Sequence, residues 1–149
     1  MKILLVCSGN ICRSPTAEGL LTKLCADAGL DCTFDSAGMH GMHAGEAPDT
    51  RAIKMAKSHG IDISKQRARQ IRDSDFDEFD IIYAMDSGHM QGLKAKRPTG
   101  AHAKLKMFDE NMDVPDPWYG DMSHFEETYS IIESAAQKIV QDLKDKAHD

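Results

Sequence analysis

Long apolar runs and a signal-like N-terminus are both missing from this sequence. No stretch comes near the ~20 consecutive apolar residues that a membrane-spanning helix needs. The N-terminus carries Lys2 and then a short apolar run, without the charged and apolar regions of a signal peptide. We therefore expect a cytoplasmic protein whose partners do not include a membrane.

Positively charged residues are outnumbered by negatively charged ones. The chain has 18 Lys and Arg against 24 Asp and Glu, for a formal net charge of −6 at pH 7. An acidic chain is poorly suited to bind nucleic acid or an anionic membrane surface, although it can still hold a small basic pocket. We therefore expect no nucleic-acid partner.

Cysteine spacing typical of zinc sites is absent as well. The four cysteines, Cys7, Cys12, Cys25 and Cys32, form no Cys-x2-Cys pair and no compact Cys/His set. In a cytosolic chain they are expected to be thiols and not a disulfide framework. His40 and His43 share one loop, which we interpret as solvated and not as a metal pair. The sequence thus predicts no metal and no other cofactor.

What the sequence does have is an alternation of strand and helix patterns. Its 149 residues are 41% hydrophobic, which predicts one domain, 1–149, with a substantial core. Because strands alternate with helices, we expect βαβ units and a four-stranded parallel sheet flanked by helices on both faces. Strands are predicted at 3–6, 32–37, 79–85 and 104–108, and helices at 15–28, 49–58, 87–96 and from a Ser123-x-x-Glu126 capping box onward.

Residues 7–14 connect the first predicted strand to the first predicted helix. Ligands of open α/β sheets bind at such a turn, and the free N–H groups of a helix N-terminus favour an anion. Gly9 is expected to bend the backbone with a positive φ, and Asn10 also tolerates that region. Arg13 adds a planar fork that matches two phosphate oxygens. Ser14 is positioned to cap the helix.

Cys7 opens this loop at the end of the strand, where its sulfur would face the bound anion. The surrounding N–H groups and Arg13 favour the thiolate, which is the nucleophilic form of cysteine. A thiolate beneath a phosphate-shaped cradle implies nucleophilic attack on phosphorus. The alternative interpretation is a buried cysteine that only packs in the core.

Displacing an oxygen atom from phosphorus in this way also needs a proton donor for the departing oxygen. Spacing alone does not choose among the many carboxylates. Asp116 is the best candidate, because prolines on both sides stiffen its loop and two aromatic residues, Trp118 and Tyr119, follow it. The alternatives are an ordinary Asp-Pro turn and aromatic side chains that merely cover a core.

These motifs resemble those of a known family. A cysteine, five residues, then Arg-Ser at a strand-to-helix turn resembles the cysteine-dependent phosphatases. The thirteen-residue string 6–18 and the Asp-Pro-aromatic-aromatic sequence at 116–119 are similar to the low-molecular-weight protein-tyrosine phosphatases. The resemblance implies the sheet order 2-1-3-4 and hydrolysis of phosphotyrosine in proteins through a phosphocysteine. It also implies inhibition by phosphate-like oxyanions.

The resemblance assigns roles to individual positions. Cys7 would be the nucleophile, Arg13 would bind the phosphate, and Asp116 would act as general acid and then as base. Ser14 would donate a hydrogen bond to the thiolate, and Ser36 would support Asn10. The remaining loop residues that would bind phosphate are Ser8, Gly9, Asn10, Ile11, Cys12 and Ser14, and those that would line the substrate slot are Met42, Trp118 and Tyr119.

One position departs from the family pattern. The family often has a histidine in the network around Asn10, in the stretch before an Ala-Arg-Gln sequence. Here Gln66 and Arg67 precede Ala68-Arg69-Gln70, so no histidine stands there to support Asn10. We also hypothesise that Cys12 forms a reversible disulfide with Cys7 under oxidants.

Three other functions are compatible with such a loop. An arsenate reductase would need two further downstream cysteines, and no cysteine follows Cys32. A phosphoarginine phosphatase would tend to carry Thr where this chain has Ile11, and the apolar Ile11 suits a flat aromatic ring better. A non-catalytic phosphopeptide-binding module would need neither Cys7 nor Asp116.

Overall fold

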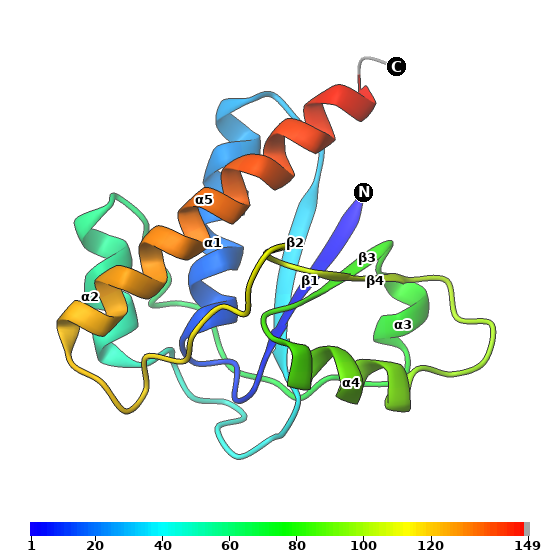
Figure 1. The fold of residues 1–149 in the computed structure, drawn as a ribbon, viewed down its shortest axis with the longest axis horizontal. Helices are drawn as coiled ribbons and strands as arrows, with labels where there is room; N and C mark the ends of the chain where they lie inside the picture. Colours follow the sequence, from blue (N-terminus) through cyan, green and yellow to red (C-terminus); the bar gives the residue numbers. More distant parts are fainter. Residues whose placement is uncertain (148–149) are drawn as a thin grey trace.

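The computed structural model describes residues 1–147 of the chain. Helices and strands alternate along the chain, as the pattern predicts, except that two helices separate the second and third strands (Figure 1). In chain order the elements are β1 (Lys2–Cys7), α1 (Arg13–Asp27), β2 (Thr33–Gly38), α2 (Thr50–Ser58), α3 (Asp75–Glu78), β3 (Ile81–Ala84), α4 (Ser87–Lys96), β4 (Lys104–Met107) and α5 (Met122–Ala147).

The sheet is parallel and has the order β2-β1-β3-β4, which confirms the predicted fold class. The chain leaves β1 towards β2 on one side, and β3 pairs on the other. Cys7, the last residue of β1, lies opposite Gly38 of β2. The loop after Cys7 therefore sits at the switch point of the sheet, where ligands of open α/β sheets bind.

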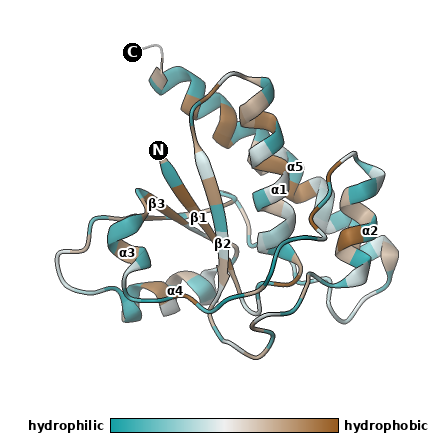
Figure 2. Ribbon diagram, turned by 180° about the vertical axis from the view of Figure 1, so that it is seen from behind, coloured by the Kyte–Doolittle hydropathy of each residue, from teal (hydrophilic) through white to brown (hydrophobic). Residues whose placement is uncertain are grey.

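The two faces of the sheet carry different helices. Figure 1 shows α1, α2 and α5 on one side, and α3 and α4 on the other. The side chains of β1 alternate between them, as a strand requires. Leu5 and Cys7 pack in the cluster that includes α1 and α5, whereas Leu4 and Val6 pack in the cluster that includes α3 and α4. The central strands are accordingly the most apolar part of the ribbon (Figure 2).

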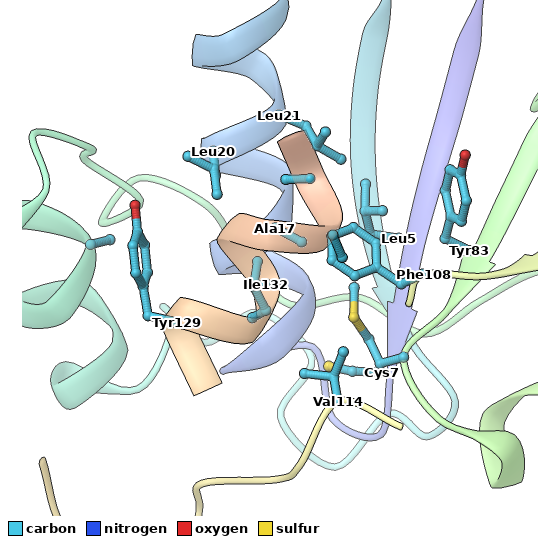
Figure 3. Packing of buried hydrophobic residues seen from close by; sticks show 14 of the residues in the cluster. Leu5, Cys7, Ala17, Leu20, Leu21, Tyr83, Phe108, Val114, Tyr129 and Ile132 are labelled. Carbon is cyan, nitrogen blue, oxygen red and sulfur yellow. The ribbon is translucent and has the colours of Figure 1, made fainter. Parts of the chain in front are cut away.

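The α1–α5 side of the core reaches down to the candidate site. Ile132 of α5, Ala17 of α1 and Phe108 after β4 are all buried in this cluster. Figure 3 shows Cys7 at its lower end, beside Val114. The nucleophile candidate thus projects from the rigid, buried end of a central strand.

Most predicted boundaries lie within a few residues of the observed ones, but two caps were predicted wrongly. Helix α1 begins at Arg13 after Cys12, so Ser14 lies inside the first turn and does not cap it. At the start of α5 the cap is Asp121, whose carboxylate accepts from the Ser123 amide at 3.0 Å. No side chain caps α1, whereas Asp121 takes the place of Ser123 at α5. The short helix α3 was not predicted.

Candidate active site

The backbone of the loop at residues 8–12 is shaped by Asn10 rather than by Gly9. Asn10 has φ of 61°, while Gly9 is not among the residues with positive φ, contrary to the prediction. Position 9 leaves little room for a side chain, because two histidines would have to move. A Cβ atom there would lie 3.0 Å from His43 Cδ2 and 3.1 Å from His40 Cε1.

Cys7 is buried, and its sulfur takes part in a hydrogen bond. The Ser14 hydroxyl lies 3.0 Å from Cys7 Sγ. The same hydroxyl oxygen accepts a hydrogen bond from Asn10 Nδ2 at 2.9 Å, which leaves its own proton for the sulfur. This arrangement supports a sulfur that carries negative charge.

The side-chain amide of Asn10 makes hydrogen bonds through both its nitrogen and its oxygen. Its Nδ2 also donates to Ser36 Oγ at 2.9 Å, and its Oδ1 accepts from the Arg69 backbone N–H at 3.0 Å. The predicted contact with Ser36 is therefore present. Gln66, in the stretch before Ala68-Arg69-Gln70, does not join this network and donates to the Pro15 carbonyl at 3.1 Å. The fully bonded amide keeps Asn10 in its left-handed conformation.

Glu18 completes this network and was not assigned a role from the sequence. Its carboxylate accepts a hydrogen bond from Ser36 Oγ at 2.6 Å. Burial raises the pKa of Glu18 to about 7, with nearby Asp35 adding to the effect, while Ser36 and Arg69 oppose it. A hydrogen-bonded chain thus runs from Glu18 through Ser36, Asn10 and Ser14 to Cys7.

The raised pKa of Glu18 predicts a pH-dependent stability. The folded state binds the proton more tightly than the unfolded chain, so Glu18 destabilises the fold progressively as pH rises from about 4.5 to about 7. Glu18→Gln keeps an acceptor for Ser36 without the charge. At about pH 8 it should raise the melting temperature by about 3 °C, or about 1 kcal/mol, and the gain should vanish near pH 4.

Thermal unfolding followed by circular dichroism across this pH range checks the expectation. Glu127→Gln, at an exposed position of α5, is the matched control and should show no such trend. A Glu18→Gln protein that is less stable than wild type at pH 8 would mean that the network needs the carboxylate.

Arg13 is 4% exposed, and hydrogen bonds from its guanidinium hold it in place. Its Nη1 donates to Asp86 Oδ2 and to the Val114 carbonyl, each at 3.0 Å. Its Nη2 donates to Ser8 Oγ at 3.2 Å and lies 3.6 Å from Asp116 Oδ2. Both hydrogens of Nη1 are used by the protein, so Nη2 and Nε form the edge that is available to a phosphate.

The loop that carries Asp116 is fastened over the site. Asp116 Oδ1 accepts from the Trp118 N–H at 3.0 Å, which leaves Oδ2 directed towards Arg13. Arg51 of α2 donates to the carbonyls of Trp118 at 3.1 Å and Gly120 at 2.9 Å. Asp49 in turn accepts from Arg51. These contacts hold the loop in place and thereby position the Asp116 carboxylate. Neither Asp49 nor Arg51 was predicted to take part.

One cleft of about 410 Å³ brings most of the predicted site residues together. Its outer wall is unusually exposed, with Met42 at 80% and Tyr119 at 93%. Asn10, Ser14 and Ser36 lie behind the cleft as its support. The predicted residues that line it are Cys7, Ser8, Gly9, Ile11, Cys12, Arg13, Met42, Asp116, Trp118 and Tyr119.

His40 and His43 also line this cleft, although the sequence suggested only a solvated loop. Their ring centroids are 6.3 Å apart, and His43 lies 5.8 Å from the Trp118 ring. Within residues 1–147, no group of three or more His, Cys, Asp or Glu side chains is arranged to hold a metal ion. No helix in that part of the chain is both long and apolar enough to cross a membrane.

Comparison with known proteins agrees with this geometry. A family model described as low molecular weight phosphotyrosine protein phosphatase matches residues 2–149. The low molecular weight phosphotyrosine protein phosphatase of Schizosaccharomyces pombe is 36% identical over 152 residues, covering 96% of this chain and 97% of the relative.

Solved structures are similar over almost the full length. A protein tyrosine phosphatase from Entamoeba histolytica matches with a TM-score of 0.92 and 34% identity, covering 99% of both chains. A Drosophila arginine phosphatase matches with a TM-score of 0.90 and 31% identity, covering 97% of this chain and 98% of that one. The chain therefore belongs to the low molecular weight phosphotyrosine protein phosphatases.

Proposed function

We propose that this chain hydrolyses phosphotyrosine in proteins through a phosphocysteine formed on Cys7. One observation carries the proposal: the Cys7 thiol, the phosphate-matching edge of Arg13 and the Asp116 carboxylate meet in a single cleft. The exposed aromatic wall formed by Trp118 and Tyr119 suits the flat ring of a tyrosine.

In the first step, Cys7 Sγ attacks phosphorus while the bond to the tyrosine oxygen breaks. The departing oxygen takes a proton from Asp116. Arg13 and the loop N–H groups stabilise the charge on the three remaining phosphoryl oxygens. The Ser14 hydroxyl, 3.0 Å from the sulfur, stabilises the thiolate before attack and as it is released.

In the second step, the Asp116 carboxylate takes a proton from water. The resulting oxygen attacks phosphorus, the sulfur–phosphorus bond breaks, and inorganic phosphate leaves. Phosphate-like oxyanions fill the same cradle, so inorganic phosphate and vanadate should inhibit competitively. The residues that act in both steps come from this chain alone.

The choice between phosphotyrosine and phosphoarginine is the sharpest test of the substrate, because a similar structure belongs to an arginine phosphatase. Ile11 lines the cleft and is apolar and β-branched, which favours contact with an aromatic ring. We expect kcat/KM for a phosphotyrosine peptide to exceed that for the matched phosphoarginine peptide by at least about tenfold. Ile11→Thr should narrow this ratio.

Initial rates of phosphate release on the two peptides measure this ratio. Faster turnover of phosphoarginine would replace the proposed substrate. Binding of the phosphotyrosine peptide without turnover of either peptide would instead favour a non-catalytic phosphopeptide-binding module.

Cys12 is expected to protect the nucleophile from overoxidation. Both sulfurs are buried in the same loop, and burial, with Asp49 and Cys7 adding to it, raises the pKa of Cys12. Peroxide should therefore oxidise Cys7 first, and Cys12 should then close a disulfide with it. After peroxide and then thiol treatment, wild type should recover most of its activity and Cys12→Ser should recover several-fold less. Equal recovery of the two proteins would contradict this role.

A further inference from the structure

His89 is a buried histidine at the back of the phosphate cradle, with no role assigned so far. It lies in the first turn of α4, on the face of the sheet opposite α1 (Figure 1). Its backbone N–H donates to Asp86 Oδ1 at 2.8 Å. The side chain is 6% exposed, and its Nε2 lies 2.8 Å from Ser8 Oγ.

The surroundings of His89 fix which ring nitrogen carries the proton. Burial, and then the charge of Arg13, lowers the pKa of His89 to about 4, although Asp86, Asp113 and Asp116 oppose the shift. The imidazole is therefore neutral near pH 7. Its Nδ1 is buried, lies 3.3 Å from the carboxylate oxygen Asp86 Oδ1, and makes no hydrogen bond within residues 1–147.

If Nδ1 carried no proton, its lone pair would face the negative charge of Asp86, which is repulsive. Nδ1 must therefore carry the ring proton, which leaves Nε2 as an acceptor. The Ser8 hydroxyl then donates to His89 Nε2. With its proton so directed, Ser8 Oγ turns a lone pair to Arg13 Nη2, 3.2 Å away.

Arg13 is thus held at both terminal nitrogens by groups connected to His89. Asp86 accepts from Arg13 Nη1 and also faces the imidazole. Ser8 accepts from Arg13 Nη2 and donates to the imidazole. Without His89, the Ser8 proton would be free to rotate towards the guanidinium, where it repels a donor.

We propose that His89 is a positioning residue that aligns the phosphate-binding edge of Arg13 through the Ser8 hydroxyl. The inference rests on the proposed function, in which Arg13 binds the phosphoryl group. His89 touches neither substrate nor the reacting atoms. Its effect should appear wherever the alignment of Arg13 matters, in phosphoryl transfer and in phosphate binding alike.

The test is a double-mutant cycle between Ser8→Ala and His89→Phe. Each single change should lower kcat/KM for an aryl phosphate by about tenfold, the rate equivalent of roughly one net hydrogen bond. Because both break the same connection, the double variant should be no more than about twofold worse than either single one. The inhibition constant for inorganic phosphate should rise in the same order.

His89→Gln is the conservative variant, because its Oε1 can still accept from Ser8. It should recover most of the activity that His89→Asn, with its shorter side chain, loses. This pair also tests the proposal if phenylalanine at position 89 prevents folding. His102→Phe is the matched control and should leave kcat/KM unchanged, because the His102 side chain is 60% exposed, bonds to Asp80 and does not line the cleft.

Multiplicative losses in the Ser8→Ala, His89→Phe protein would overturn the proposal, since they would mean that the two residues act independently. Equal activity of the Gln and Asn variants would also overturn it. A wild-type protein that binds inorganic phosphate but turns over no aryl phosphate would instead contradict the proposed function. In that case the phosphate affinities of the same variants still decide the role of His89.

Discussion

Replacing Cys7 by serine should reduce the turnover of an aryl phosphate by at least about 10⁴-fold, as expected for loss of a nucleophile. A serine hydroxyl is far less acidic than a thiol, and within residues 1–147 the Cys7 sulfur is hydrogen-bonded to the Ser14 hydroxyl and not to a base. The substitution is small and the site is rigid, so the fold and phosphate binding should both survive.

Phosphate release at about pH 6 in the presence of a metal chelator measures this loss against wild type. Cys25→Ser is the matched control, because Cys25 is a buried thiol of α1 that takes no part in the cleft. It should lose stability and keep its kcat/KM. Turnover that persists in Cys7→Ser would mean that another group attacks phosphorus.

Replacing Asp116 by asparagine should lower kcat/KM, and the loss should be larger for substrates whose leaving oxygen is more basic. For phenyl phosphate or phosphotyrosine, which need a proton on the departing oxygen, we expect a loss of about 10²–10⁴ in kcat/KM. For aryl phosphates with strongly electron-withdrawing groups, the loss should shrink towards tenfold or less. The asparagine Oδ1 can still accept from the Trp118 N–H, so the loop should keep its shape.

A series of substituted phenyl phosphates measures this dependence. Asp113→Asn is the matched control from the same loop, because its carboxylate accepts from the backbone and side chain of Ser87 and does not line the cleft. It should leave the dependence on the leaving group unchanged. A uniform loss across the series in Asp116→Asn would show that Asp116 does not supply the proton.

The sequence predicted those parts of the site that are local in the chain. The string 6–18 places a strand, a turn and a helix within a few residues, so the placement of Cys7, Asn10 and Arg13 around this turn could be predicted from neighbouring residues alone. Helix α4 was predicted with its observed bounds, because Pro98 limits its C-terminal end. The cap at its start, Asp86, was not predicted.

The parts that could not be predicted depend on distant contacts or on fine backbone geometry. Asp86 and Arg13 are 73 residues apart, and nothing in either neighbourhood signals their ion pair. The same is true of Arg51, which holds a loop 67 residues further on. Whether Gly9 or Asn10 takes the positive φ depends on the bonds that the Asn10 amide makes with Ser36 and Arg69.

The short helix and the helix caps could not be predicted from the sequence for a different reason. Helix α3 is a single turn, too short to show helical periodicity, and is held by the buried carboxylate of Asp75, which accepts from the Arg69 side chain and the Arg72 backbone. The helix caps are chosen among neighbouring polar residues whose side chains compete for the same N–H groups. The Ser14 hydroxyl is used by Cys7 and Asn10 instead, and Asp121 accepts from the Ser123 N–H at the start of α5.

The central claim is that phosphorus is bonded to the Cys7 sulfur during turnover. Asp116→Asn should lack the base that activates water, so the covalent intermediate should accumulate with p-nitrophenyl phosphate as substrate. We would quench this reaction under denaturing conditions and map the modified peptide by mass spectrometry. The account predicts one phosphoryl group on the peptide that contains Cys7, and none in the Cys7→Ser, Asp116→Asn protein. A phosphoryl group on any other residue, or turnover with no covalent intermediate, would contradict it.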